Sequence, residues 1–379
     1  MALSSTGREE RYPGAVTRAA QPAPPPAISP GLRVLLVLAA TVIVLAGVYF
    51  ARSLIGPLAL AIVLVVICEP VRRPLERRGW PRWAGTTAVI LLAYLVLAVM
   101  GVLLWVAGVQ FAGLVSDYLD QLRGSLDDVL AWLQSAGLDQ QATDAAASVL
   151  DPKALLGLVG SIGGTVIGVV TALFFVVSYI IFTAADAARY RDAERVFGAG
   201  RRPVLARIGR LNTGVRRYYV VNASFGAIVA IIDGLALWAL GVPAPIVWAV
   251  LAFVTNFIPN IGFVLGLIPP AVLAFVVGGW PMFLAVIAIY CVVNVVLQVL
   301  VQPKFVSDAV DLSLTLSFFS VVFWTFVIGP LGAILSIPLT LFVRTLVLEG
   351  DPGSLWLRWL SGDRTATPAS AARESLTDS

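Results

Sequence analysis

The sequence of 379 residues contains no histidine, only two cysteines, Cys68 and Cys291, and only two lysines, Lys153 and Lys304. Without histidine, the chain cannot build a Ser-His-Asp triad, a histidine general base or the common zinc sites. The two cysteines fall within or at the ends of apolar stretches, which does not indicate a disulfide framework. No G-x-x-x-x-G-K-[ST] phosphate loop occurs, so ATP is not an expected ligand. We therefore expect no enzyme, no cofactor and no bound metal.

Charged residues are also scarce, at 13% of the chain, whereas 59% of the residues are hydrophobic. Average soluble proteins are about a quarter charged. Apolar runs recur along almost the whole length, and several exceed the roughly 18 residues that a spanning helix needs. The sequence therefore predicts an all-α, polytopic integral membrane protein. Its formal net charge of +4 comes from arginines beside the apolar runs rather than from one patch, so nucleic acid is not an expected partner.

About seven to ten apolar segments are predicted within residues 31–348, the expected membrane domain. The segments are 32–50, 54–68, 84–108, 157–184, 218–240, 244–258, 261–278, 282–301, 312–328 and 331–347. Several are shorter than a full span, such as 54–68, which suits a tilted helix or one half of a hairpin with 32–50. Residues 1–30 and 349–379 are predicted to be tails, and the first is predicted to be disordered because it is polar and rich in proline and alanine.

The loops between these segments alternate in charge. Residues 69–83 carry five arginines, 109–156 carries seven aspartates against two basic residues, and 185–217 carries nine arginines against three acids. Because basic loops stay in the cytoplasm, 69–83 and 185–217 are predicted to be cytoplasmic and 109–156 extracytoplasmic. Both termini are then predicted to be cytoplasmic. The preference for arginine over lysine suggests a GC-rich bacterial genome.

The acidic segment 109–156 is not a plain loop. Between Phe111 and Leu133, apolar residues recur at steps of three and four, which predicts an amphipathic helix. Such a helix fits on the outer leaflet, as a cap on the helix bundle, or at a contact between protomers, and the sequence leaves these positions open.

The arginines of 201–217 are predicted to set the topology and to contact anionic lipids, with a cytosolic partner as the alternative.

The stretch Thr255 to Pro270, TNFIPNIGFVLGLIPP, lies in the most apolar part of the chain yet carries three prolines, two glycines and two asparagines. Pro259 removes a backbone donor, and Pro269-Pro270 is expected to break the segment a second time. In hydrocarbon, a helix break is tolerated only where protein or water satisfies the freed backbone groups. The stretch therefore predicts a re-entrant or kinked hairpin, the kind of element that holds sites in transporters, with a purely packing role as the alternative.

Five other polar positions are candidates for function. Asp233 is the only acid in the interior of the predicted spans, where a charged carboxylate costs at least about 2.5 kcal/mol. The hypothesis is that Asp233 titrates or binds a cation; the alternative is a protonated or water-exposed carboxyl near the outer mouth. Asn294, Gln298 and Gln302 share one helix face, which suits a polar cavity or interhelical hydrogen bonds. Lys304 is expected at the cytoplasmic end, where its ammonium group can reach phosphate headgroups.

Three blocks of sequence carry a resemblance: LWALGVPAPIVWAVLAFVTNFIPNIGFVLGLIPP, NVVLQVLVQPKFVSDAVDLS and the interrupted GPLGAILSIPLT. Together with the Arg-rich RRPLERRGWPRWA, they resemble the autoinducer-2 exporter (AI-2E) family of bacterial inner-membrane permeases. The resemblance covers about residues 32–348, and the I-P-x-I-G and Q-P-K blocks are its most specific parts. It implies a multi-pass, homo-oligomeric transporter. Members are associated with export of the signalling molecule autoinducer-2, and others resemble sodium or lithium/proton antiporters; a channel and a non-transporting scaffold or regulator are the alternatives.

The expected partners are therefore a small-molecule or ion substrate, membrane lipids and further copies of the chain. The candidates for the substrate or ion pathway share a polar side chain or a helix-breaking residue near the interrupted segments. They are Asp233, Asn256, Pro259, Asn260, Gly262, Gly266, Pro269, Asn294, Gln298, Gln302, Pro303 and Lys304.

Overall fold

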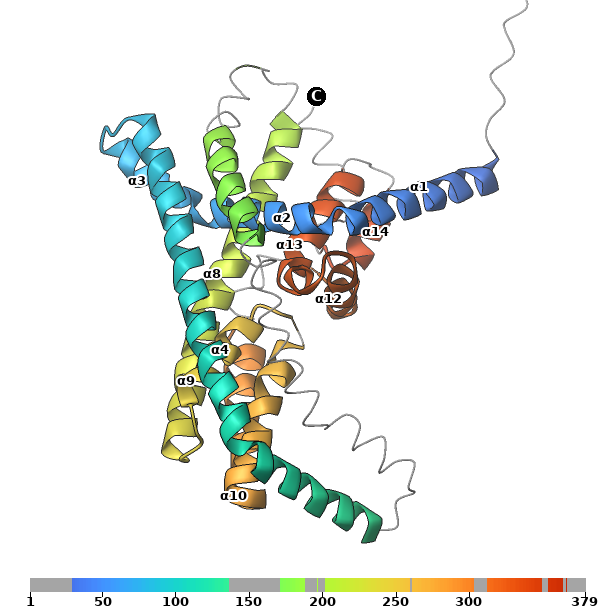
Figure 1. Ribbon diagram of the computed structural model, residues 1–379. Helices are drawn as coiled ribbons and strands as arrows, with labels where there is room; N and C mark the ends of the chain where they lie inside the picture. Colours follow the sequence, from blue (N-terminus) through green and yellow to red (C-terminus); the bar gives the residue numbers. More distant parts are fainter. Residues whose placement is uncertain are drawn as a thin grey trace, which may run out of the picture. The chain divides into compact units, whose positions relative to one another are not determined.

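The computed structural model describes residues 29–135, 171–187, 196, 202–259, 261–302, 312–349, 354–363 and 366. The chain divides into two units, Met1–Gly47 and Val48–Ser379. In the described residues every regular element is a helix, as the sequence predicts (Figure 1). The first unit contains most of helix α1 (Pro30–Phe50), an apolar helix of 21 residues. All the candidate pathway residues belong to the second unit.

Among the described residues, five helices are long and apolar enough to cross a membrane by their length and composition: Arg52–Arg77, Arg82–Leu114, Val204–Ala239, Gly262–Val301 and Pro330–Val347. Shorter apolar helices are Val34–Phe50, Thr171–Ala187, Pro245–Thr255 and Leu314–Ile328. Large apolar side chains on their surfaces are exposed, among them Leu91, Trp238 and Phe326, at 62, 71 and 75% of full exposure. Helices with so much outward-facing apolar surface suit hydrocarbon rather than water. The prediction of a polytopic membrane protein is confirmed.

The second unit begins with α2 (Arg52–Cys68), the short 3-10 turn η1 (Glu69–Val71), α3 (Arg72–Arg77) and α4 (Arg82–Ser135). Gly79, at φ 82°, turns the chain between α3 and α4. Helix α4 has 54 residues, which corresponds to about 80 Å. It therefore continues from the predicted span 84–108 into the acidic segment as far as Ser135, and the side of the membrane on which that segment lies stays a prediction.

The remaining elements are α8 (Arg202–Ala239), α9 (Pro245–Thr255), α10 (Gly262–Asn294), the π-helix η3 (Val295–Val301), α12 (Leu314–Ile328), α13 (Pro330–Val347) and α14 (Leu355–Leu360). Helices α8 and α9 form an antiparallel pair around a turn that contains Gly241 at φ 75°. Gly234 of α8 faces Ala249 of α9 so closely that a Cβ on Gly234 would lie 2.9 Å from the Ala249 methyl group. The absence of a side chain at Gly234 thus lets the two helices approach.

Helix α10 is a helical hairpin, as the interrupted sequence predicts, but its turn lies elsewhere. Pro269 and Pro270 stay inside the first arm, and the non-helical residue is Gly279, at φ 65°. The prediction of a second break at Pro269-Pro270 is therefore wrong. Pro270 is fully buried, and packing against neighbouring helices can stabilise the arm despite the missing backbone donors. Beyond Gly279 the chain folds back, and the Phe275 ring packs 5.1 Å from the ring of Trp280.

Helices α12 and α13 form a second hairpin, at the predicted interruption GPLG. Gly329, at φ 89°, joins the two helices. Gly332 lies against the backbone of α12, where a Cβ would overlap the carbonyl oxygen of Trp324. The Trp324 indole N–H donates to Thr340 Oγ1 at 2.9 Å across the hairpin. Both hairpins thus turn at a glycine with positive φ.

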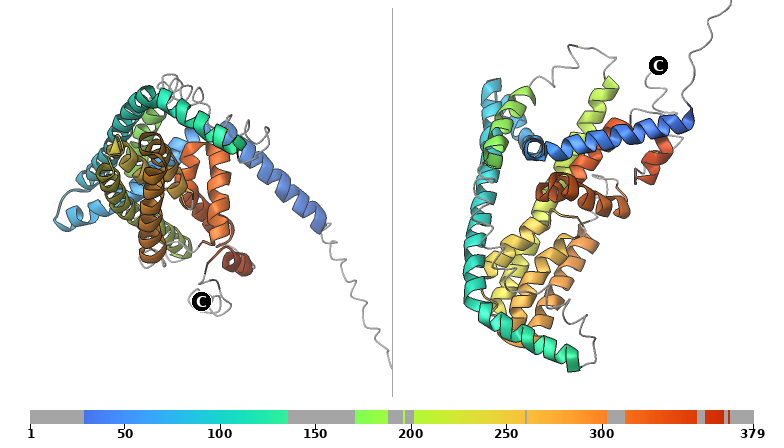
Figure 2. Two further views of the ribbon diagram at one scale, coloured as in Figure 1. Left: turned by 90° about the horizontal axis from the view of Figure 1, so that it is seen from below. Right: turned by 45° about the vertical axis from the view of Figure 1, so that its right-hand side comes forward.

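Two apolar clusters flank the middle of α8. One joins α2, α8 and α13 and includes Val63, Tyr219 and Leu335. The other joins α8, α9 and both arms of α10 and includes Leu237 and Tyr290. The right-hand view of Figure 2 shows α8, α9 and α10 side by side. The part of α8 between these clusters carries the polar residues described next.

Candidate functional site

A partly buried network of side-chain amides joins three helical segments. Asn256, just past the end of α9, donates to the backbone oxygen of Asn222 on α8 at 2.8 Å. Gln298 of the π-helix η3 donates to Asn256 Oδ1 at 2.8 Å and also to Asn294 Oδ1. Gln302 donates to Asn222 Oδ1 at 3.1 Å. Two members of the predicted polar stripe 294–298–302 therefore bond to other helices, Gln298 to the Asn256 amide and Gln302 to the Asn222 amide. Asn294 bonds within its own helical segment, to the Tyr290 oxygen and to Gln298.

The break after α9 places Asn256 in this network. Because Pro259 has no backbone N–H, the helix ends at Thr255, and the Ile258 N–H bonds to the Thr255 oxygen at 2.9 Å in a tight turn. Gly262 then starts α10 directly against that turn, since a Cβ on Gly262 would overlap the Thr255 carbonyl oxygen. Asn256 is therefore the first side chain beyond α9, and it points its amide across to α8.

Gly226 on α8 provides the space for the Asn256 amide. A Cβ on Gly226 would lie 2.8 Å from Asn256 Nδ2. Gly226→Ala is therefore expected to displace Asn256 from its bond to Asn222 and to destabilise the protein by about 1–2 kcal/mol. The measurement is the thermal unfolding midpoint in detergent.

Gly209→Ala in the same helix is the matched control, because a Cβ on Gly209 meets nothing within 4 Å. Alanine there is expected to be neutral or to stabilise by up to about 1 kcal/mol through helix propensity. Equal stabilisation by Gly226→Ala and Gly209→Ala would contradict the placement of the Asn256 side chain.

Asp233 lies about three turns along α8 from Asn222 and is 0% exposed. In the part of the chain that the structure describes, neither of its carboxylate oxygens has a hydrogen-bond partner, and the same is true of the Tyr290 hydroxyl. Both residues line a small cavity with Thr255 and Asn294. The volume of this cavity is about 10 Å³, counted as the space available to the centre of a water molecule. It therefore has room for about one water molecule or small ion.

This arrangement limits the chemistry of the cavity. An isolated ionised carboxylate is very unfavourable when buried, so Asp233 must be neutral or must be compensated by a cation. Asn294 and Thr255 supply neutral oxygen atoms beside it. Among the described residues no group of three or more His, Cys, Asp or Glu residues gathers to hold a metal ion. The cavity therefore suits a proton, or a monovalent cation held by one carboxylate and neutral oxygens.

The structure brings together five of the predicted pathway residues in the lining of this cavity: Asp233, Asn256, Gly266, Asn294 and Gln298. Gln302 joins the network through Asn222, and Pro259 and Gly262 shape the break. Pro269 lies in the first arm of α10 and does not line the cavity. Asn260, Pro303 and Lys304 lie outside the described residues.

Three residues of the site were missed from the sequence. Asn222 interrupts an apolar run, and that polarity was a usable signal. Thr255 and Tyr290 have ordinary membrane-helix side chains, so only their place in the cavity distinguishes them.

Comparisons with known proteins agree with this architecture. The sequence pattern of the family described as "AI-2E family transporter" matches residues 38–350. The "AI-2 transport protein TqsA" of Escherichia coli K12 is 29% identical over 337 residues, which cover 88% of this chain and 96% of the relative. A "Putative transport protein" of Haemophilus influenzae is 27% identical over 87% of this chain and 96% of its own length. "Putative transport protein MT0215" of Mycobacterium tuberculosis is 28% identical over 84% and 90%, respectively. With most of its length matched and its helices built for a membrane, this chain belongs to the AI-2E family of transporters.

Proposed function

We propose that this permease exports a small polar solute of the autoinducer-2 kind across the bacterial cytoplasmic membrane, along its partly buried amide network. The observation that carries the proposal is the meeting of Asn222, Asn256 and Gln298 from three helical segments. A neutral polar solute that leaves water needs hydrogen-bond donors and acceptors of this kind. The relative in Escherichia coli whose name includes AI-2 transport supports the same class of cargo.

The interruption between α9 and α10 supports the same pathway. Transporters place their sites where helices are broken, because unwound segments present backbone groups to the substrate. Here the break at Pro259 lies next to Asn256, so backbone and side-chain polar groups occur together. The basic character of 69–83 and 185–217 supports an orientation with α3 and the start of α8 in the cytoplasm. Membrane lipids and further copies of the chain are the expected partners.

A second candidate function is exchange of a cation for protons. The observation that favours it is Asp233, whose buried carboxyl group faces a cavity large enough for one small ion. A carboxyl that alternates between a proton and a cation is the simplest coupling device for such exchange. The two functions use neighbouring groups, so separate measurements are needed to distinguish them.

The test of export uses inside-out membrane vesicles that contain the full-length protein. Wild-type vesicles are expected to accumulate labelled autoinducer-2. Gln298→Leu is expected to lower the initial rate about tenfold, because it removes one donor from the network and leaves the oxygens of Asn256 and Asn294 unpaired. Gln110→Leu on α4 is the matched control, since Gln110 is exposed and lies outside the network, and its rate is expected to match that of the wild type.

The same vesicles, loaded with a pH-sensitive dye and given sodium or lithium, report cation exchange. Accumulation of autoinducer-2 without cation-dependent proton movement supports export alone. No accumulation by folded wild-type protein would overturn the proposed cargo, and cation-dependent proton release in that case would establish the second function.

A further inference from the structure

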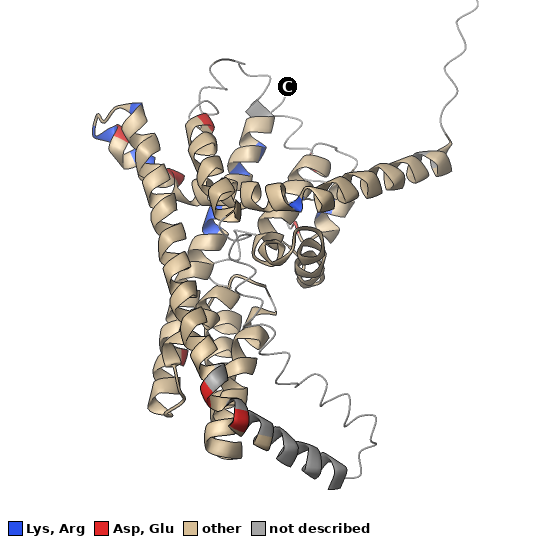
Figure 3. Ribbon diagram, in the orientation of Figure 1, with Lys and Arg blue, Asp and Glu red and all other residues tan. Residues whose placement is uncertain are grey.

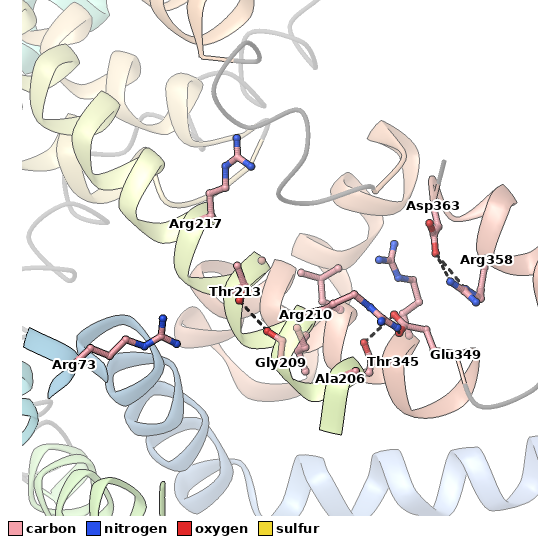
Figure 4. Close-up of a pocket in the computed structure, with 14 residues that line it drawn as sticks. Arg73, Ala206, Gly209, Arg210, Thr213, Arg217, Thr345, Glu349, Arg358 and Asp363 are labelled. Atoms are coloured by element: carbon pink, nitrogen blue, oxygen red, sulfur yellow. Dashed lines mark hydrogen bonds and ion pairs between the residues drawn. The ribbon is translucent and has the colours of Figure 1, made fainter. Parts of the chain in front are cut away.

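A second and much larger cavity lies among α3, α8, α13 and the residues around α14. Its volume is about 690 Å³, within the range of roughly 300–1,000 Å³ typical of small-molecule sites. The candidate pathway residues are not part of its lining. Figure 4 shows its walls, with side chains contributed by helices far apart in the sequence. The cavity is therefore separate from the amide network and is large enough for a small organic ligand.

The charges that line this cavity are unbalanced. Five arginines line it, namely Arg73, Arg210, Arg217, Arg344 and Arg358, against two acids, Glu349 and Asp363. The described lining thus carries five positive and two negative charges, which leaves a net charge of +3 whatever the pairing. Figure 3 shows Lys and Arg positions along the ribbon near α3 and in the first half of α8, the helices that contribute Arg73, Arg210 and Arg217 to the lining.

Both acids in the lining are already engaged by neighbouring side chains. Asp363 Oδ2 accepts from Arg358 Nη2 at 3.0 Å and from Arg358 Nε at 3.2 Å. Glu349 accepts from the Thr345 hydroxyl at 3.2 Å and lies 3.7 Å from Arg210. In Figure 4, Arg73 and Arg217 lie on the side of the cavity away from both acids. Among the described lining residues, the side of the cavity formed by α3 and the middle of α8 therefore carries Arg73 and Arg217 and neither acid.

The wall of the cavity formed by α8 also leaves room for a ligand. Gly209 lines it, and a Cβ there would meet nothing within 4 Å. Thr213, one turn further on, lines the same wall and is exposed. Guanidinium groups that surround an open polar space match the geometry of phosphate oxygens, which they bind through paired N–H donors.

We propose that this cavity binds a phosphate-bearing anion, with Arg73 and Arg217 as its principal contacts. Such a ligand lowers the repulsion among the clustered guanidinium groups and links α3 to α8 and α13. Arg217 stands little more than one turn before Asn222 on the same helix, so the ligand holds the start of the helix that also carries the amide network. The phosphate belongs either to a free phosphorylated solute or to a phospholipid headgroup.

The test measures the thermal unfolding midpoint of the full-length protein in detergent while inorganic pyrophosphate is titrated, with sodium chloride of equal ionic strength as the reference. A ligand that binds only the folded state raises the midpoint as its concentration increases. Wild-type protein is expected to show a rise with pyrophosphate beyond that with chloride. Arg73→Gln and Arg217→Gln are each expected to weaken the apparent affinity about tenfold, as for loss of one charge-assisted hydrogen bond.

Neighbouring arginines supply matched controls. Arg77→Gln on α3 and Arg216→Gln on α8 remove the same charge from residues that do not line the cavity. Both are expected to leave the pyrophosphate affinity unchanged. Arg73→Lys keeps the charge without the planar fork and is expected to retain an intermediate affinity.

A second arm identifies the source of the phosphate. The protein is placed in nanodiscs of phosphatidylcholine, with and without phosphatidylglycerol, and pyrophosphate binding is measured in each. Competition by phosphatidylglycerol that requires Arg73 and Arg217 assigns the cavity to a lipid headgroup; undiminished pyrophosphate binding assigns it to a free phosphorylated solute. The proposal is overturned if neither probe binds, or if the control variants lose as much affinity as the cavity variants.

Discussion

Replacing Asp233 by asparagine is expected to lower the rate of coupled transport at least about tenfold. The protein is expected to stay as stable as the wild type or to become more stable. The carboxyl group is fully buried and, among the described residues, has no hydrogen-bond partner. Asparagine has nearly the same shape but no ionisable group, so it removes the cost of burying a charge. A residue kept for stability would show the opposite pattern, with a lower unfolding midpoint and normal transport.

The measurement combines solute and proton flux in inside-out vesicles with the unfolding midpoint of the same preparation. Asp117→Asn is the matched control, because Asp117 is an exposed acid of α4 outside the cavity. Transport by Asp233→Asn that equals the wild-type rate, with unchanged dependence on pH and cations, would show that the buried carboxyl has no role in the cycle.

Gly262→Ala is expected to destabilise the protein by about 3 kcal/mol or more, the upper end of the cost of overpacking. A methyl group at this position would overlap the carbonyl oxygen of Thr255, a backbone atom that cannot rotate away. The turn between α9 and α10 would have to open, which would also move Asn256. Helix propensity alone predicts the reverse sign, because alanine is favoured over glycine by about 1 kcal/mol.

The equivalent change in the second hairpin, Gly332→Ala, is expected to have an effect of similar size, since its methyl group would overlap the carbonyl oxygen of Trp324. Gly101→Ala on α4 is the control, with nothing within 4 Å of its Cβ. Size-exclusion profiles after heating report the folded fraction for all three variants. Unfolding midpoints for Gly262→Ala and Gly332→Ala that match that of Gly101→Ala would contradict the close backbone contacts of α10 with the end of α9 and of α13 with α12.

Some of the helix interruptions can be predicted from local chemistry alone. Pro259 lacks a backbone N–H in any fold, so the end of α9 could be predicted from this residue. The same is true of Gly329 and Pro330 between α12 and α13. Pro269-Pro270 looks equivalent in sequence, yet the first arm of α10 continues through it and turns at Gly279. Packing around the buried Pro270 made the difference, and packing is not a local property.

The candidate site divides in the same way. An acid and a stripe of amides inside apolar runs are unusual enough to be found by reading the chain, which is how Asp233, Asn294 and Gln298 were predicted. That Gln298 meets Asn256, 42 residues away, and that Asn256 in turn reaches Asn222, 34 residues away, depends on the approach of three helices. Gly226 matters for this site because its missing side chain leaves room for the Asn256 amide. That neighbour is known only from the tertiary structure.

By itself, then, the sequence determined that the helices lie in a membrane and at which residues a helix must end. Both follow from properties of single residues, namely hydrophobicity and the missing backbone donor of proline. The tertiary structure decided which polar groups line the cavity at Asp233. It also decided which arginines line the larger, basic cavity among α3, α8 and α13. Those outcomes depend on interhelical distances, and in a membrane, where apolar helix faces gain little by associating with one another, close contact between small residues sets these distances.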